Sequence, residues 1–203
     1  MRTLIRFRLF RILVMAIALT MAAGAPAQGA PAAVHEHPFV ELGLDYNYVR
    51  ANAPPAGCGC FSMNGGDAWA AYNFTSSLAA VAQFSGQHAS NVNRSGADLT
   101  LKSYLFGARY SWRNSSRFAP FGQALFGGSH AGTNLSSGGP VLGNTSNSFA
   151  LSAGGGLDVS LTRHFAVRAF EADYFRTQFP SGMNDRQNNL RLGAGLILKW
   201  GKD

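Results

Sequence analysis

Residues 187–201 read QNNLRLGAGLILKWG and alternate between large apolar side chains and small or polar ones. One face of this segment carries Leu190, Leu192, Ala194, Leu196, Leu198 and Trp200. The other face carries Asn189, Arg191, Gly193, Gly195 and Lys199, with Ile197 as the exception. A period of two indicates a β-strand with one face in an apolar environment. The glycine-rich polar face favours a narrow, closed interior.

The same alternation is equally clear in residues 39–50 and recurs less regularly in six segments between. No segment after residue 38 shows the apolar spacing of an amphipathic helix. The eight predicted strands are residues 39–50, 66–74, 78–87, 98–113, 118–131, 148–161, 165–177 and 187–201. Segments of about 9–11 residues already suffice for tilted strands to cross a bilayer. The chain is therefore predicted to be all-β.

The connections between the predicted strands alternate in length. The second, fourth and sixth are three or four residues long, as in Thr75-Ser76-Ser77. The others are longer, rich in Gly, Asn, Ser and Pro, and span residues 51–65, 88–97, 132–147 and 178–186. Short periplasmic turns and long outside loops are typical of outer-membrane barrels. We therefore predict an eight-stranded antiparallel up-and-down transmembrane β-barrel, with a secreted lipocalin-like barrel as the alternative.

The N-terminus has the pattern of an export signal. Residues 1–11 mix arginine with apolar residues, an apolar run follows to Ala23, and Ala25-Pro26-Ala27 provides small residues for cleavage. This order predicts a secretory signal peptide at residues 1–27. The apolar run is shorter than the roughly 20 residues of a membrane-spanning helix, which is the alternative. Residues 28–38 are predicted to be a flexible lead-in, and residues 39–201 the barrel.

Composition excludes two other classes. The formal net charge of +7 at pH 7 suggests nucleic-acid binding, but four of the seventeen basic residues precede residue 12. Without them the net charge is 13 − 10 = +3, so no nucleic-acid partner is expected. An aromatic content of 12% argues against disorder. A charged fraction of 13% is about half of the roughly 25% usual in soluble proteins, as expected where alternate strand residues face lipid.

Several stretches resemble a known family. The segment from Gly154 to Phe179, the following NNLRLGAGLILKWG, LFGARYSW at 105–112 and PFGQALFGG at 120–128 resemble the OmpA-like outer-membrane barrels. The resemblance implies an eight-stranded barrel in the bacterial outer membrane, inserted by the barrel assembly machinery. No sequence for a peptidoglycan-binding domain follows the predicted barrel, so we expect the barrel domain only and carry over no tether to the cell wall. Many family members end in an aromatic residue, and here Trp200 is expected to take that role although Gly201, Lys202 and Asp203 follow it.

The inward faces of the predicted strands carry a polar cluster. Its predicted members are Glu41, Asp45, Gln83, Arg109, Gln123, Asp158, Glu171, Asp173, Arg191 and Lys199. The alternation changes phase in residues 165–177, so Arg168 either follows a β-bulge or lies at the membrane rim. Buried charges must be paired or hydrated. We expect a salt-bridged polar plug, with a gated ion path or a catalytic cluster as the alternatives.

The first long loop contains Cys58 and Cys60, which an oxidising compartment favours as a strained loop disulfide. Two thiolates are half of a zinc site, and His35 and His37 lie in the lead-in, so no metal site and no cofactor are predicted.

The segment His88-Ala89-Ser90-Asn91 resembles the His-x-Ser-Asn element of outer-membrane lipid A deacylases. The resemblance implies Ser90 as a nucleophile and His88 as its base. Asp98 is the nearest downstream acid, but its spacing differs from the family's, and we place the element in a polar loop. No catalytic residue is therefore assigned.

The sequence thus predicts a non-enzymatic structural barrel with a role in envelope integrity or in surface adhesion and recognition. The expected partners are outer-membrane lipid and lipopolysaccharide, the assembly machinery, and an extracellular ligand bound through the loops. A lipid-modifying enzyme and a narrow ion channel remain as alternative functions.

Overall fold

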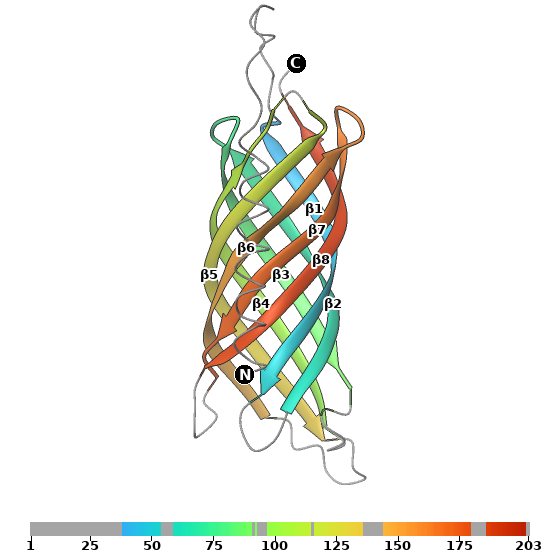
Figure 1. Ribbon diagram of the computed structural model, residues 1–203. Coiled ribbons are helices and arrows are strands. Elements are labelled where there is room, and N and C mark those ends of the chain that lie inside the picture. Colours follow the sequence, from blue (N-terminus) through green and yellow to red (C-terminus); the bar gives the residue numbers. More distant parts are fainter. Residues whose placement is uncertain are drawn as a thin grey trace, which may run out of the picture. The chain divides into compact units, whose positions relative to one another are not determined.

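The computed structural model describes residues 38–53, 59–90, 92, 97–114, 116–135, 144–179 and 186–201 (Figure 1). The predicted signal peptide and nearly all of the lead-in lie outside the described residues. The described strands are β1 (Val40–Ala53), β2 (Gly59–Asn73), β3 (Leu78–Ala89), β4 (Ala97–Ser111), β5 (Phe118–Leu135), β6 (Asn144–Ser160), β7 (Phe165–Thr177) and β8 (Gln187–Trp200). No helix among the described residues is long and apolar enough to cross a membrane.

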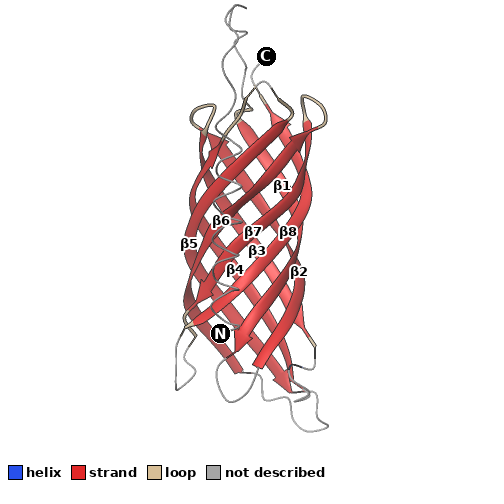
Figure 2. Ribbon diagram, in the orientation of Figure 1, coloured by secondary structure: helices blue, strands red, loops and turns tan. Residues whose placement is uncertain are grey.

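Every strand pairs antiparallel with its neighbour in sequence, and β1 pairs with β8 to close the barrel. The predicted eight-stranded up-and-down barrel is therefore confirmed. Three short turns lie at the end of the barrel where β1 begins and β8 ends, and the long connections lie at the other end (Figure 2). Closure pairs both edges of the sheet, as a bilayer without water requires.

The alternation read from the sequence separates a lipid-facing surface from the lumen. On β1, Leu44 is 68% exposed while its neighbour Asp45 is 5% exposed. Ile197, the exception to the pattern of β8, is completely buried on the lumen face. Outward aromatic side chains gather at the short-turn end, where Phe39 contacts Tyr72 with ring centroids 4.4 Å apart. Such a girdle is typical of a membrane interface.

Three of the four long connections are shorter than predicted, and the fourth, residues 178–186, has the predicted bounds. β1 continues to Ala53 and β2 begins at Gly59, so residues 59–65, predicted to be loop, are strand. In the same way, β5 ends at Leu135 and β6 begins at Asn144, so both strands reach into the predicted loop 132–147. These extensions contain polar residues and glycines. Antiparallel strands satisfy their backbone hydrogen bonds by pairing, so they can continue beyond the apolar band with polar side chains.

Strand β7 contains a β-bulge. Leu157 pairs with Phe170 and Asp158 with Arg168, which leaves Ala169 as the extra residue. The bulge turns Arg168 inward, onto the same side as Glu171, and Arg168 is completely buried. Of the two alternatives left open by the sequence, the bulge is the one observed.

Candidate functional site in the barrel lumen

The polar cluster in the lumen is built around two arginines. Arg168, from β7, donates from Nε to Asp158 Oδ1 at 2.9 Å and from Nη1 to Asp45 Oδ2 at 3.1 Å and to Glu171 Oε2. One guanidinium group thereby joins β1, β6 and β7. Planar guanidinium groups suit such multiple pairing with carboxylates because their five donors have a fixed geometry.

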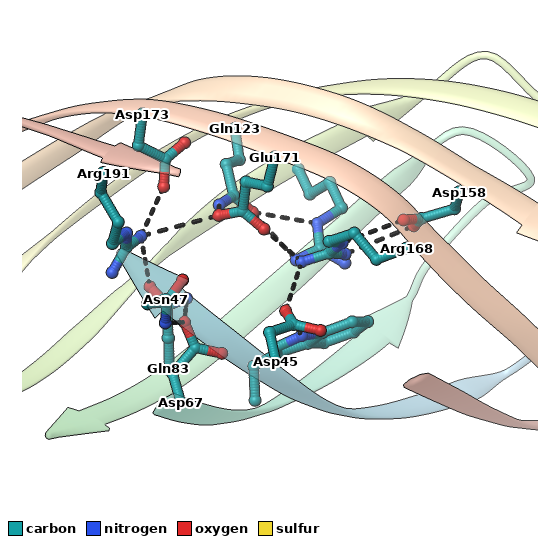
Figure 3. Close-up of polar contacts among 12 residues, drawn as sticks. Asp45, Asn47, Asp67, Gln83, Gln123, Asp158, Arg168, Glu171, Asp173 and Arg191 are labelled. Atoms are coloured by element: carbon teal, nitrogen blue, oxygen red, sulfur yellow. Dashed lines mark hydrogen bonds and ion pairs between the residues drawn. The ribbon is translucent and has the colours of Figure 1, made fainter. Parts of the chain in front are cut away.

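Arg191, from β8, is the second centre. Its Nη2 donates to Asp173 Oδ2, to Gln83 Oε1 at 3.0 Å and to Ser152 Oγ at 3.2 Å. The same nitrogen lies 3.6 Å from Glu171 Oε1. Glu171 therefore lies between the two arginines and connects them (Figure 3).

Two chains of hydrogen bonds extend this core across the lumen. Gln123 Nε2 donates to Glu171 at 2.8 Å, and Gln123 Oε1 accepts from Arg109 Nη2 at 2.9 Å. On the other side, Asp67 Oδ2 accepts from Gln83 at 2.8 Å and from Asn47 at 2.6 Å. The connected side chains come from all eight strands, and Arg109 is the member from β4.

The aromatic rings of Trp69 and Phe121 pack against the guanidinium groups of Arg109 and Arg168. The Cζ atom of Arg168 is 4.4 Å from the ring centroids of both Trp69 and Phe121. The Cζ atom of Arg109 is 4.1 Å from Trp69 and 4.8 Å from Phe121. Trp69 also donates from its indole nitrogen to Asp45 Oδ2 at 2.7 Å. Desolvated cation–π contacts of this kind contribute on the order of 2 kcal/mol each.

The cluster concentrates the acidic groups of the barrel. Six of the seven acidic residues that the structure describes are buried in the lumen, and Asp98 is the seventh. Four buried basic residues accompany them: Arg109, Arg168, Arg191 and Lys199. Pairing compensates the desolvation of these charges, and removing one partner would leave another charge buried and unpaired.

A separate polar group lies near the short-turn end. Glu41 accepts two hydrogen bonds of 3.0 Å from Arg113, which follows β4 and also donates to Asn73. Lys199 donates to Ser160 at 2.8 Å. The side chain of Arg113 is 17% exposed, so this ion pair lies close to the mouth of the lumen.

All ten residues of the predicted lumen cluster are buried in the structure. Eight of them belong to the connected network around the two arginines, whereas Glu41 and Lys199 lie apart near the short turns. The sequence interpretation did not assign Asp67, Trp69, Phe121 or Arg113 to the lumen. Extending the alternation of β2 past Ala68 and Ala70 would have placed Asp67 and Trp69 on the inward face.

The interior is not polar throughout. At the end of the lumen nearer the long connections, apolar side chains are buried beside the polar Gln87, Ser103, Ser129 and Thr177. Val49, Met63, Leu101, Ala150 and Phe175 are at most 4% exposed there. They pack in one apolar cluster, with Phe61 and Leu99 against it. This apolar layer lies inside the lumen, between the polar network and the long connections. An ion would have to displace both layers to cross the lumen, so the arrangement suits a structural plug better than an open path.

The outer wall carries a second group of interest. Ser90 Oγ lies 3.2 Å from His88 Nε2, and His88 Nδ1 lies 3.1 Å from Thr100 Oγ1. His88 is exposed on strand β3, so its placement in a polar loop is corrected. Thr100 therefore contacts the second ring nitrogen of His88.

The two cysteines give no metal centre among the described residues. Cys60 is exposed on β2, while Cys58 and the predicted disulfide lie outside the described residues. No group of three or more His, Cys, Asp or Glu side chains suited to a metal ion occurs in the described part of the chain.

Solved structures share this fold. Neisserial surface protein A superposes with a TM-score of 0.61 at 16% identity over 79% of this chain and 97% of its own. Ail, the attachment invasion locus protein of Yersinia pestis, gives 0.50 at 20% identity over 77% and 97%. OprG from Pseudomonas aeruginosa gives 0.54 at 12% identity over 83% and 98%. At these identities the likeness shows the fold alone. No curated protein matches the chain in sequence.

A family model described as the outer membrane protein beta-barrel domain matches residues 15–197. The match covers nearly all of the barrel and agrees with the closed eight-stranded sheet. It also decides between the two barrel classes considered from the sequence, against the lipocalin-like alternative. The chain belongs to the outer-membrane β-barrel family and is located in the bacterial outer membrane.

Proposed function

We propose that this protein is a non-enzymatic structural barrel that supports envelope integrity and uses its long connections for surface recognition or adhesion. These connections join β1 to β2, β3 to β4, β5 to β6 and β7 to β8. The observation that carries the proposal is the complete burial of Arg168 among three carboxylates. A guanidinium fixed in this way suits a sealed scaffold, which leaves recognition to the parts of the chain outside the lumen.

The physical argument concerns register. Each side chain paired with Arg168 or Arg191 comes from a particular position of its strand, and slipping a strand by one residue would turn that side chain to lipid. A charge facing the bilayer midplane costs about 2–4 kcal/mol for Arg or Lys. The cluster therefore favours a single closed register, which is a requirement of a durable envelope protein.

Export through residues 1–27, insertion by the assembly machinery and contact with lipopolysaccharide belong to the same proposal. Attachment is named for one protein of this fold, Ail, which makes adhesion a reasonable role for the long connections. The fold does not select the ligand, because unrelated functions share one fold.

A deletion strain tests this proposal. It would be complemented with the intact protein or with variants in which one long connection is replaced by Gly-Ser residues of equal length. We expect deletion to increase sensitivity to bile-salt detergent and every folded loop variant to restore resistance. We also expect at least one loop variant to lose adherence to a panel of immobilised matrix proteins and polysaccharides. A deletion strain that matches its parent in both assays contradicts the proposal.

A second candidate function, hydrolysis of an ester in an outer-leaflet lipid, is favoured by the contact between Ser90 and His88. Their 3.2 Å separation is within reach for a nucleophile and its base in a ligand-free site. The test compares the lipid A mass profile of cells that carry the intact protein or Ser90→Ala. Loss of a deacylated species in the variant supports an enzyme, and identical profiles exclude it.

A further inference from the structure

The lipid-facing wall of β2 and β3 contains an apolar groove of about 650 Å³. Its floor is made by Ala68, Ala70 and Ala82, which all point outward from adjacent strand positions. Larger side chains form the two walls, Leu44 and Leu196 on one side and Phe106 on the other. The groove exists because small side chains occupy positions where neighbouring strands carry large ones.

The groove continues toward the long-connection end. A second hollow of about 540 Å³ shares Leu44, Ala68 and Phe84 with the first and adds Gly66 and Gly86. Gly66 and Gly86 are paired across β2 and β3, so the floor remains low between them. The groove therefore runs along both strands from the middle of the wall toward the outer leaflet.

The outer end of the groove is polar and basic. Lys102 is paired with Gly86 and is exposed on the outward face of β4. Arg50 is exposed on β1 four residues beyond Tyr46, which lines the groove, and it donates to Ser62 Oγ at 3.1 Å. Asp98 is the one described acid on the outer wall; it lies four residues from Lys102, about 13 Å along the strand, and has contacts of its own. Asp45 and Asp67 also line the second hollow, but their carboxylates bond to Arg168 and Gln83 inside the lumen. On the outer wall, the charged side chain next to the groove is therefore Lys102.

We propose that this groove binds an acyl chain of a phosphate-bearing lipid of the outer leaflet, with Lys102 holding the phosphate. The occupant follows from the position of the groove, because acyl chains surround the wall of an outer-membrane barrel. The length of the groove and its basic end match a lipid with a long apolar part and an anionic headgroup. The proposal rests on the contact with outer-membrane lipid in the proposed function and gives that contact a place on the wall. It holds whether or not Ser90 is a nucleophile.

The full chain in detergent would be titrated with phosphatidylglycerol and with phosphatidylcholine of the same acyl chains, and bound lipid counted by native mass spectrometry. We expect one tight site that prefers phosphatidylglycerol. Ala82→Phe fills the floor and should weaken binding of both lipids about tenfold, the equivalent of about two buried methylene groups. The matched control Ala124→Phe lies on the outward face of β5, outside the groove, and should bind as the intact protein does.

The headgroup contact has its own variant. Lys102→Ala should weaken phosphatidylglycerol about fivefold, the contribution of one lysine near an anionic surface, and leave phosphatidylcholine unchanged. Arg117→Ala, which removes an exposed base at the opposite end of the barrel, should change neither.

Folding of each variant would be checked by its heat-modifiable gel mobility, and Ala70→Leu provides a smaller obstruction if Ala82→Phe does not fold. Equal lipid binding by the folded groove variant and Ala124→Phe overturns the proposal. A dimer that the groove variant abolishes also overturns it, because the occupant would then be a second copy of the chain.

Discussion

Trp69 occupies the space beside the α-carbon of Gly43, its partner across β1 and β2. A Cβ atom at Gly43 would lie 2.1 Å from Cε2 of the indole, closer than any real contact. The indole in this position donates to Asp45 and contacts Arg109 and Arg168. Because Gly43 has no side chain, the Trp69 indole can occupy the position from which it contacts the polar network.

Gly43→Ala is expected to lower stability by about 1–3 kcal/mol, because the indole must move and its contacts with both arginines weaken. Urea unfolding in detergent micelles, followed by gel mobility without heating, measures the change. Gly132→Ala is the matched control, since a Cβ there meets nothing within 4 Å. Equal urea midpoints for Gly43→Ala and Gly132→Ala would contradict this account, because they would show that the Trp69 indole can shift without loss of stability.

Arg168→Met removes the centre of the network and leaves Asp45, Asp158 and Glu171 without their shared cation. We expect a loss of about 3–5 kcal/mol, the usual cost of breaking a buried pair from one side. Arg117→Met, at an exposed base, should stay within about 0.5 kcal/mol of the intact protein.

A double-mutant cycle separates pairing from packing. Asp158→Asn combined with Arg168→Met should cost less than the sum of the single changes, because the two side chains are bonded at 2.9 Å. If the losses of unfolding free energy from the two single changes add up to the loss in the double variant, the ion pair itself contributes nothing to stability.

Leu44→Arg tests the membrane-facing wall. Leu44 is the most exposed large apolar side chain of β1, and it lies well inside the apolar band between Phe39 and the outer tyrosines. Arginine at the midplane should cost about 2–4 kcal/mol in lipid vesicles. His88→Arg, on the outward face near the long connections, should cost at most about 1 kcal/mol. Similar tolerance at both positions would contradict the assigned depth.

The alternation in β1 and β8 predicted the barrel well because lipid on one side and a crowded lumen on the other impose a period of two. It also placed ten buried polar residues on the inward face. It failed at residues 59–65, where strand pairing continues beyond the bilayer and the side chains no longer report a lipid face.

The partners within the lumen depend on register and closure, which sequence patterns do not contain. Glu41 and Arg113 are 72 residues apart and meet only because the barrel closes. The bulge at Ala169 moves Arg168 onto the inward face, and the sequence signal for it was a change of phase with two explanations. The apolar layer at Val49 and Met63 was missed because glycines and polar residues dominate the neighbouring sequence.

Ion flux through the barrel tests the central claim most directly, namely that the lumen is sealed by the network around Arg168 and the apolar layer beyond it. The protein would be reconstituted into vesicles, its insertion confirmed by heat-modifiable mobility, and potassium efflux and single-channel current recorded. The structure predicts efflux equal to that of protein-free vesicles and no unitary current. Steady unitary openings from the inserted, folded protein would contradict a sealed structural barrel and favour the channel.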